Sequence, residues 1–375
     1  MAATGTSANN TTLLNGTSAT CFILNDPPEV VLTHKISLYS CMLFVVVGVI
    51  GNALSIVVFT NKNMRTMSSN TYLLALAFSD SLYLVSVFFA DVLKNLKCFY
   101  FPAIPLDVVN NSSVVCQLSQ YFLDLFSDYS TCLILVFTIE RFIAVYLPVR
   151  FKQLCTLRRA RITCIGVFAV IASFIAPYHV LYMGLYTDEL GRVYNYCSIK
   201  GVEYERPFMI LYVTESVLFR IVPVFAIAVV NVFIIVRVTR VSREHRKRIA
   251  ASGKPNKRTR KEEKNLQLTI MLILVSTSYV LLYLPVLVTF VIDYLKRSEA
   301  IEISQHDMLM ASDYTRALYV SGFAINFFLY TISGRVFREQ LQLILHCTRG
   351  RDDRNGYVKS TAETDALTCK HSGDR

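Results

Sequence analysis

The chain has 375 residues, of which 53% are hydrophobic and only 17% are charged, and its formal net charge is +11. This composition excludes an ordinary soluble domain, because the apolar residues lie in blocks of about 20 or more, enough to cross roughly 30 Å of hydrocarbon as helices. The positive charge does not indicate a nucleic-acid partner, since basic residues are usual in the cytoplasmic loops of membrane proteins.

Seven apolar segments predict seven transmembrane helices, and therefore an all-α membrane protein. They span residues 36–60, 71–93, 117–145, 162–183, 208–236, 266–293 and 309–332. The third is the most polar, so we expect it inside the bundle rather than against lipid. The sequence divides into an N-terminal segment (1–35), the bundle (36–333), a surface helix (334–347) and a tail (348–375), with no internal repeat and no second domain.

Charge and glycosylation sequons together predict the orientation. The segments 150–161 and 237–264 are rich in Lys and Arg, which places both in the cytoplasm. Asn-X-Ser/Thr sequons, the expected glycosylation sites, fall on the opposite side: Asn9, Asn10, Asn15, Asn110 and Asn111. We therefore expect a multi-pass plasma-membrane protein with an extracellular N-terminus, whose first span acts as the insertion signal.

The ten cysteines divide by side of the membrane. Cys21, Cys98, Cys116 and Cys197 fall outside, where disulfides persist. The favoured pair is Cys116, at the outer start of the third span, with Cys197 in the second outer loop. Four cysteines allow three pairings, so a bond between Cys21 and Cys98 stays open.

Short motifs fall in order along the spans and carry a family resemblance. They are Gly51-Asn52, Leu76-Ala77-Phe78-Ser79-Asp80, Cys116, Glu140-Arg141-Phe142, Pro223, Pro285 and Asn326-Phe327-Phe328-Leu329-Tyr330. From about residue 37 to 347 the chain resembles the rhodopsin-like (class A) G-protein-coupled receptors. It looks most like the neuropeptide receptors of the invertebrate FMRFamide-like and thyrotropin-releasing-hormone-like groups.

The resemblance implies a switch and an ion site. Glu140 and Arg141 would form an ion pair that opens when a heterotrimeric G protein is engaged, and the kink at Pro285 would act as a hinge. Asn326 and Tyr330 would complete the switch. Asp80 would bind Na⁺ together with Ser130 and Asn326, and the alternative is a hydrogen-bonded polar cluster without an ion. No other cofactor and no metal site is expected.

The segment after Tyr330 predicts a short amphipathic helix that contacts membrane lipid at the surface. Its apolar face is formed by Phe337, Leu341, Ile344 and Leu345. Cys347 is a candidate for palmitoylation. Hydroxyl residues of the tail are candidate phosphorylation sites for arrestin binding: Ser360, Thr361, Thr364 and Thr368.

The chain departs from the family pattern at several positions. It has no tryptophan, Tyr283 occupies the place of the sixth-span toggle, and Phe327 stands where a proline is usual. Asn231 replaces a tyrosine that supports the freed arginine, and Asn265 offers no acid at the base of the sixth span. We therefore expect the inner lock to rest on the acid of the third span and on Thr269.

Residues in the outer half of the spans predict the kind of ligand. Val320 stands where opsins carry their retinal lysine and Leu123 where amine receptors carry an aspartate, so neither class is expected. The candidate ligand contacts are Asp124, Asp128, Glu215, Arg220, Tyr283, Arg316 and Tyr319. We expect them to contact a charged or amidated extracellular peptide. The alternative for Arg220 is that it only neutralises Asp124 or Asp128.

Other functions stay open or are disfavoured. The alternatives with the same fold are a receptor for a small-molecule or chemosensory ligand, and an orphan receptor with high basal activity. An enzyme is not expected, because a zinc hydrolase needs several ligands on neighbouring helices and only His179 lies within a span. A transporter would show paired repeats with broken helices.

Overall fold

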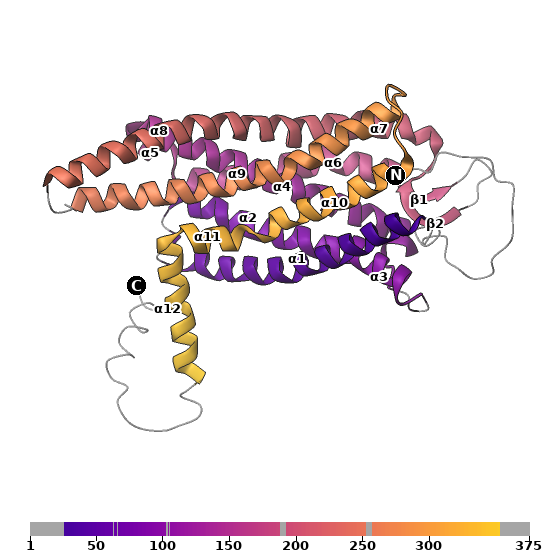
Figure 1. Cartoon of the computed structure of the whole chain (residues 1–375), viewed down its shortest axis with the longest axis horizontal. Coiled ribbons are helices and arrows are strands. Elements are labelled where there is room, and N and C mark those ends of the chain that lie inside the picture. Colours follow the sequence, from indigo (N-terminus) through magenta and orange to yellow (C-terminus); the bar gives the residue numbers. More distant parts are fainter. Residues whose placement is uncertain are drawn as a thin grey trace.

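The computed structural model describes residues 26–62, 64–65, 67–102, 104, 106–187, 193–252 and 257–352, without the side chains of 152, 193–195, 244–252, 257–265 and 346–352. In this part of the chain the long helices lie side by side along one axis (Figure 1). A two-stranded hairpin lies at one end of the bundle, and the last helix leaves the other end at a steep angle. The predicted sites at Asn9, Asn10, Asn15, Cys21 and in the tail lie outside the described residues, as does the side chain of Cys347.

The helices follow the predicted spans in order. They are α1 (Pro28–Thr60), α2 (Ser68–Val87), α3 (Leu93–Phe99), α4 (Ser113–Tyr146), α5 (Pro148–Leu154), α6 (Leu157–Tyr182), α7 (Glu205–Ser216), α8 (Val222–Ser252), α9 (Lys257–Arg297), α10 (Gln305–Ala324), α11 (Asn326–Ser333) and α12 (Arg335–Asp352). Two π-helical turns, at Phe88–Val92 and Val217–Ile221, join α2 to α3 and α7 to α8. The strands are β1 (Met183–Thr187) and β2 (Val193–Ile199).

Six helical segments among the described residues are long and apolar enough to cross a membrane. They are Pro28–Thr60, Ser68–Phe99, Ser113–Tyr146, Leu157–Tyr182, Val202–Arg243 and Leu266–Arg297. The seventh predicted span is divided into α10 and α11 at Ile325, and neither half alone is both long and apolar enough to be counted among the six. Several helices run past the predicted spans, because hydropathy marks where lipid begins and not where a helix ends.

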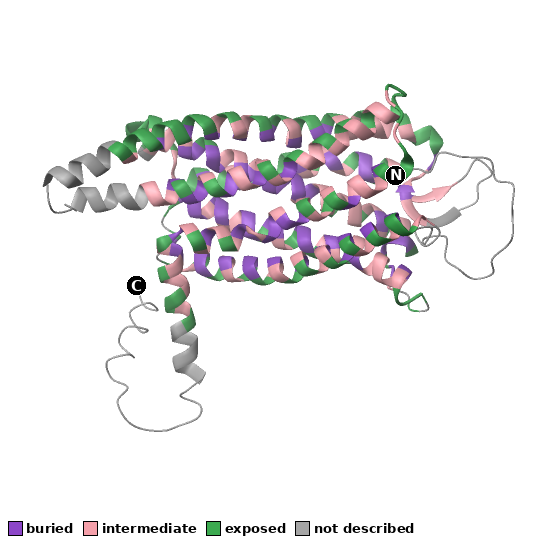
Figure 2. Ribbon diagram, in the orientation of Figure 1, coloured by how far each residue is buried: buried purple, intermediate pink, exposed green. Residues whose placement is uncertain are grey.

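The burial pattern is that of a membrane bundle, with large apolar side chains such as Leu43, Ile165 and Ile332 exposed on its outside. Buried residues line the contacts between helices (Figure 2). Helix α4 packs against α2, α6, α8 and α9, and it buries Ser127, Asp128, Ser130 and Thr131. The prediction that the third span lies inside the bundle is confirmed.

Close contacts hold α1 against the broken seventh span. A Cβ atom added at Gly48 would lie 2.5 Å from the Leu84 side chain and 2.9 Å from that of Ala324, so only glycine fits there without displacement. Next to the break at Ile325, the Asn52 side-chain amide donates to the carbonyl of Phe323 over 3.0 Å. The helix therefore breaks without a proline, and a buried amide from α1 satisfies a carbonyl beside the break.

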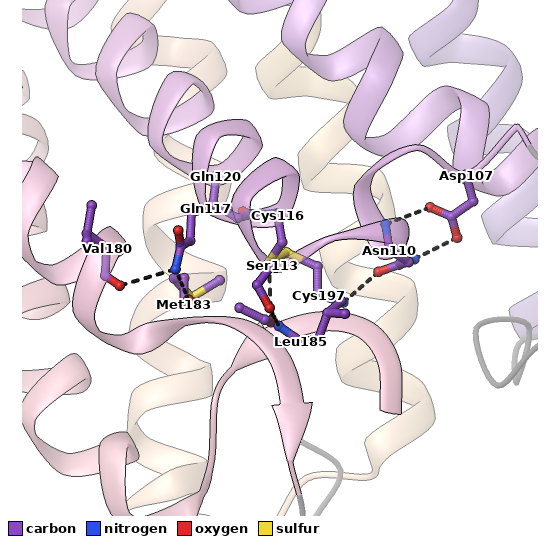
Figure 3. Close-up of a disulfide and its surroundings, with 11 residues drawn as sticks. Asp107, Asn110, Ser113, Cys116, Gln117, Gln120, Val180, Met183, Leu185 and Cys197 are labelled. Atoms are coloured by element: carbon purple, nitrogen blue, oxygen red, sulfur yellow. Dashed lines mark hydrogen bonds between the residues drawn. A yellow bond between two sulfur atoms is a disulfide. The ribbon is translucent and has the colours of Figure 1, made fainter. Parts of the chain in front are cut away.

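The hairpin β1–β2 is joined to α4 by a disulfide (Figure 3). Leu185 pairs with Cys197 in the antiparallel register, and Cys197 is bonded to Cys116 in the first turn of α4. The Leu185 amide donates to the hydroxyl of Ser113, and Gln117 donates to the carbonyls of Val180 and Met183. The predicted disulfide is confirmed. Cys98 is disulfide-bonded too.

Two of the predicted glycosylation sites, Asn110 and Asn111, lie in the loop beside the hairpin and differ in exposure. Asn110 is buried; its Nδ2 donates to Asp107 over 2.6 Å, and its Oδ1 accepts from the Cys197 amide over 2.5 Å. A glycan is attached through Nδ2, which is hydrogen-bonded in Asn110, whereas Asn111 is exposed.

Helix α12 differs in part from the predicted surface helix. Phe337 does not lie on an outer apolar face, because it is buried against the rings of Phe59 and Tyr330, with centroids 5.4 and 5.6 Å away. Leu341 and Ile344 also pack partly against the core, while Leu345 is exposed. The first turn of α12 is thus anchored by the bundle itself.

Candidate functional site

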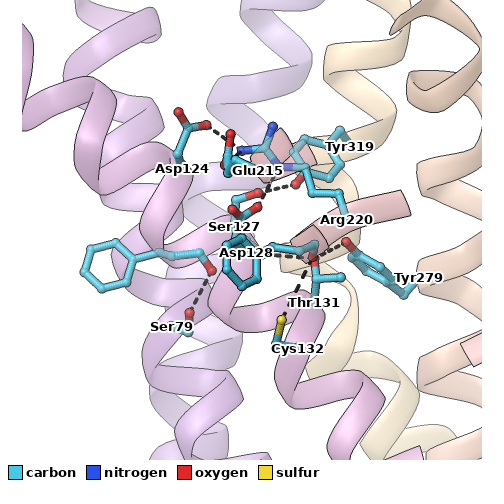
Figure 4. A network of polar contacts seen from close by, with 12 residues as sticks. Ser79, Asp124, Ser127, Asp128, Thr131, Cys132, Glu215, Arg220, Tyr279 and Tyr319 are labelled. Atoms are coloured by element: carbon cyan, nitrogen blue, oxygen red, sulfur yellow. Dashed lines mark hydrogen bonds and ion pairs between the residues drawn. The ribbon is translucent and has the colours of Figure 1, made fainter. Parts of the chain in front are cut away.

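The half of the bundle nearer the β1–β2 hairpin, which we call the outer half, contains a buried ionic cluster centred on Arg220 (Figure 4). Its Nε lies 2.6 Å from Asp128, and its Nη2 lies 2.7 Å from Glu215 and 2.8 Å from Asp124. His179 Nε2 lies 3.1 Å from the second oxygen of Asp124. We call these five residues, from α4, α6, α7 and the π turn before α8, the Arg220 cluster.

A π turn positions the central arginine. Arg220 lies in the π-helical turn Val217–Ile221, directly before α8 and close to Pro223. A π turn holds an extra residue, so it rotates the residues before it relative to those after it. Because Pro223 has no backbone N–H, it cannot donate an intrahelical hydrogen bond at this point. The irregular turn lets Arg220 contact both Glu215, five residues earlier in the chain, and the carboxylates of α4.

The members of the cluster differ in exposure. The side chains of Asp128 and Glu215 are fully buried, that of Arg220 is 10% exposed and that of Asp124 is 24% exposed. Charges at this depth are stable only when paired and hydrogen-bonded. The cluster therefore has a structural role at its base, and Asp124 is the member that the outer side can reach.

Tyrosines lie beside the cluster, toward the middle of the bundle. Tyr319 is hydrogen-bonded to Ser127 and Tyr279 to Thr131, both on α4. The ring of Tyr283 is stacked on Tyr279 and lies 5.6 Å from that of Tyr319. The predicted contacts Tyr283 and Tyr319 thus belong to one aromatic group next to Arg220.

Arg316 is held by a different partner. Its Nη1 lies 2.6 Å from Asp91, which belongs to the other π turn, Phe88–Val92, and its side chain is 43% exposed. The contacts of Arg316 and those of Arg220 are therefore made to different carboxylates. Asp91 was not expected from the sequence as a partner of Arg316, although a lone acid in an apolar span is itself a signal. The contact between His34 of α1 and Asp313 of α10 was not expected either.

The predicted polar site in the middle of the bundle is assembled. Ser130 donates to one oxygen of Asp80 over 2.7 Å, and Asn326 donates to the other over 2.7 Å. Ser130 also contacts Ser79 over 2.9 Å, and Asp80 is almost fully buried. A carboxylate with short polar neighbours suits Na⁺, and the same arrangement also stands as a hydrogen-bonded cluster.

The opposite end of the bundle holds the buried pair Glu140–Arg141, at 2.9 Å. Glu140 accepts a hydrogen bond from Ser68 over 2.9 Å and another from Ser69, which also contacts Arg141. The guanidinium lies over the ring of Phe151 of α5, 5.5 Å from its centroid. The sequence predicts the Glu140–Arg141 pair but not the contacts with Ser68, Ser69 and Phe151.

Helix α8 is tied to α9 near this inner end. Asn231, which stands at the position of the family's tyrosine, accepts a hydrogen bond from Ser276 over 3.0 Å and contacts Thr277 at 3.5 Å. Pro285 lies inside α9, nearer its outer end. A movement of the inner half of α9 would therefore either break the hydrogen bonds with Asn231 or move α8 together with α9.

Comparisons with known proteins agree with this geometry. The family described as 7 transmembrane receptor (rhodopsin family) matches residues 51–330. Growth hormone secretagogue receptor type 1 of Sus scrofa is 25% identical over 314 residues, 80% of this chain and 77% of that receptor. The thyrotropin-releasing hormone receptor of Mus musculus is 27% identical over 213 residues, 55% of this chain and 51% of that receptor.

A third relative is named for lysophosphatidic acid rather than for a hormone. Lysophosphatidic acid receptor 6 of Gallus gallus is 29% identical over 154 residues, 39% of this chain and 44% of that receptor. The match to this receptor thus spans less than half of its length. The family match covers most of the chain, including the Asp80, Arg141 and Asn326 sites described above. This chain belongs to the rhodopsin family of seven-transmembrane receptors.

Proposed function

We propose that this protein is a plasma-membrane receptor that binds an extracellular peptide at its outer half and activates a heterotrimeric G protein at its inner end. Members of the family are signalling receptors rather than enzymes. The observation that carries the proposal is the pair of buried ionic sites at opposite ends of one bundle, the Arg220 cluster and Glu140–Arg141. In this proposal the Arg220 cluster serves the ligand and the Glu140–Arg141 pair serves the transducer.

A peptide is the ligand class with the most support. Relatives named for the growth hormone secretagogue and for thyrotropin-releasing hormone match the chain over a larger share than the lysophosphatidic acid receptor does. The outer half offers carboxylates, arginines and tyrosines from several helices, which suits a ligand with many polar groups. The hairpin above α4 adds a wide outer surface.

The second candidate is a lipid or another small molecule, favoured by the match to lysophosphatidic acid receptor 6. Electrostatics argue against an anionic headgroup beside Arg220, because three carboxylates already surround that guanidinium. A small-molecule ligand would therefore have to be neutral or cationic there.

The mechanism is a shift between two states of the bundle. A ligand that binds one state more tightly raises its population. In the inactive state Arg141 is held by Glu140, Ser69 and the ring of Phe151. On activation the inner half of α9 moves about the kink at Pro285, and Arg141 leaves Glu140 to contact the G protein. In the proposed orientation the N-terminus is extracellular, and the basic loops at the inner end face the G protein.

Further sites complete the proposal. Asp80, with Ser130 and Asn326, binds Na⁺ and stabilises the inactive state. Cys347 takes a palmitoyl chain that holds α12 at the membrane surface. Phosphorylated hydroxyls in the tail recruit arrestin.

The test is a signalling screen in cells. Calcium and cyclic-AMP responses would be measured in cells expressing the chain and challenged with a library of amidated neuropeptides. We expect a response at nanomolar concentration, which Arg141→Ala abolishes without loss of peptide binding or surface expression. Silence across the library, with the receptor at the surface, would argue for the small-molecule candidate. Unchanged signalling by the Arg141 variant would overturn the mechanism.

A further inference from the structure

We propose that the loop after α3 is a membrane-contact surface, in which Tyr100, Phe101 and Ile104 lie at the boundary between lipid headgroups and hydrocarbon. The partner is the phospholipid of the leaflet at the hairpin end of the bundle, which we call the outer leaflet. The inference uses only the membrane setting of the bundle. It depends neither on the ligand nor on the G protein.

The first observation is the level of Tyr39 along α1. Tyr39 belongs to a stripe of exposed apolar and aromatic side chains that faces away from the bundle, with Leu32, Ile36, Leu43, Val46, Ile50 and Val57. The helix ends at Thr60, and the polar residues Asn61 and Lys62 follow. The stretch from Tyr39 to Thr60 rises about 31 Å at about 1.5 Å per residue, which matches a hydrocarbon thickness of about 30 Å. With Thr60 at the inner boundary of the hydrocarbon, Tyr39 therefore lies at the outer one.

The second observation is that the loop is attached to α1 at this level. The hydroxyl groups of Tyr39 and Tyr100 are hydrogen-bonded to each other, and their ring centroids lie 6.4 Å apart. The side chains of Tyr100, Phe101 and Ile104 are between 43% and 47% exposed. In Figure 1 the loop after α3 projects past α1, and in Figure 2 its tip is coloured as exposed. Apolar side chains gathered at a loop tip are unfavourable in water, whereas tyrosine is enriched at the membrane boundary.

The third observation is the backbone of the loop, whose turns make their own hydrogen bonds. The amides of Tyr100 and Phe101 donate to the carbonyl of Leu96 over 2.9 and 3.2 Å, and the amide of Ile104 donates to the carbonyl of Phe101 over 3.0 Å. A backbone group that loses water without gaining another partner is costly beside lipid. Because these three amides are bonded within the chain, the loop can approach the hydrocarbon without leaving them unpaired.

The charges around the loop suit phospholipid headgroups. Helix α3 carries Lys94 and Lys97, and the Nζ atom of Lys35 on α1 lies 5.5 Å from the centroid of the Phe99 ring. The acid of the following loop, Asp107, is buried and hydrogen-bonded within the protein. Long lysine side chains near the boundary can extend their ammonium groups toward lipid phosphates while their stems cover apolar surface. The aromatic tip and the basic residues beside it thus match the two layers of one leaflet.

The test uses the absence of tryptophan from the sequence, because one substitution then creates the sole indole fluorophore of the chain. The full-length Phe101→Trp variant would be placed in phosphatidylcholine nanodiscs whose acyl chains carry bromine close to the headgroup, at the chain end, or not at all. We expect bromine close to the headgroup to quench its fluorescence at least about twice as strongly as bromine at the chain end, since the loop lies at the boundary. Ile104→Trp should behave in the same way, and it decides the question if Phe101→Trp does not fold.

Two further single-tryptophan variants calibrate the depth. Ile50→Trp lies on the exposed stripe of α1, about 16 Å beyond Tyr39 and so near the midplane, and bromine at the chain end should quench it more strongly. Glu302→Trp, in the exposed loop between α9 and α10, should be quenched by iodide in the water and little by either brominated lipid. A Phe101→Trp receptor that responds to iodide and to brominated lipid as Glu302→Trp does would overturn the proposal. The loop would then face water, as a surface for a soluble ligand would.

Discussion

Arg220→Met should strongly destabilise the receptor, because it leaves buried carboxylates without their cation. The guanidinium lies 2.6 Å from Asp128, 2.7 Å from Glu215 and 2.8 Å from Asp124. The first two side chains are fully buried, so water cannot replace the lost partner. Methionine matches the aliphatic stem of arginine and keeps its packing, so the variant isolates the loss of the guanidinium.

The magnitude follows from burial and distance. Two opposite charges about 4 Å apart attract by about 4 kcal/mol at an effective dielectric constant of about 20, and desolvation cancels part of this. Removing one partner of a buried pair costs about 3–5 kcal/mol. Because Arg220 has two fully buried partners, we expect the free energy of unfolding to fall by about 5 kcal/mol, the upper end of that range.

The assay is the unfolding temperature of the purified receptor, together with its surface expression in cells. Arg316→Met is the matched control: its side chain is 43% exposed and pairs with Asp91 alone among the described carboxylates within ion-pair distance. It should cost no more than about 1 kcal/mol. The triple variant Arg220→Met, Asp128→Asn, Glu215→Gln should recover part of the loss, since fewer buried charges remain. An Arg220→Met receptor as stable as Arg316→Met would refute the reasoning.

Gly48→Ala should lower the free energy of unfolding by about 1–3 kcal/mol through overpacking. Gly166→Ala, which has open space around it, should not lower it. Equal decreases in the two variants would contradict the close packing of α1. Cys116→Ser should cost about 2–5 kcal/mol and reduce surface expression, and adding Cys197→Ser should cost little more. A double variant much worse than either single one would show that the cysteines act separately. Asp80→Asn should remove the rise in unfolding temperature that NaCl gives over KCl, and a wild-type receptor indifferent to the two salts would exclude the ion site.

Much of the architecture could be predicted from sequence, because a membrane restricts the structures that an apolar segment can form. A block of about 20 apolar residues has to be a helix in lipid. The polar third span had to lie inside the bundle, and Asp80 could find its partners only on facing helices. The structure confirms both expectations, with α4 central and Asp80 bonded to Ser130 and Asn326.

The contacts of several side chains could not be predicted from the sequence. Ser68 and Ser69 belong to a different helix from Glu140, and nothing in their local sequence marks them as its support. Asn110 matches a glycosylation sequon, and the sequon does not indicate its hydrogen bonds with Asp107 and with the Cys197 amide. Phe337 fits an amphipathic pattern, which does not distinguish packing on protein from packing on lipid.

The sequence by itself determined the family, the number and order of spans, and the Glu140–Arg141 pair, because these depend on apolar length and on residues adjacent in the chain. Only the tertiary structure decided that Arg220 binds several carboxylates and that Arg316 binds Asp91. Both pairings involve residues in π turns. One extra residue in a turn rotates the rest of the helix by about 100° about its axis, and hydropathy does not detect such a rotation. The direction in which a buried charge points is therefore set by helix irregularity and packing.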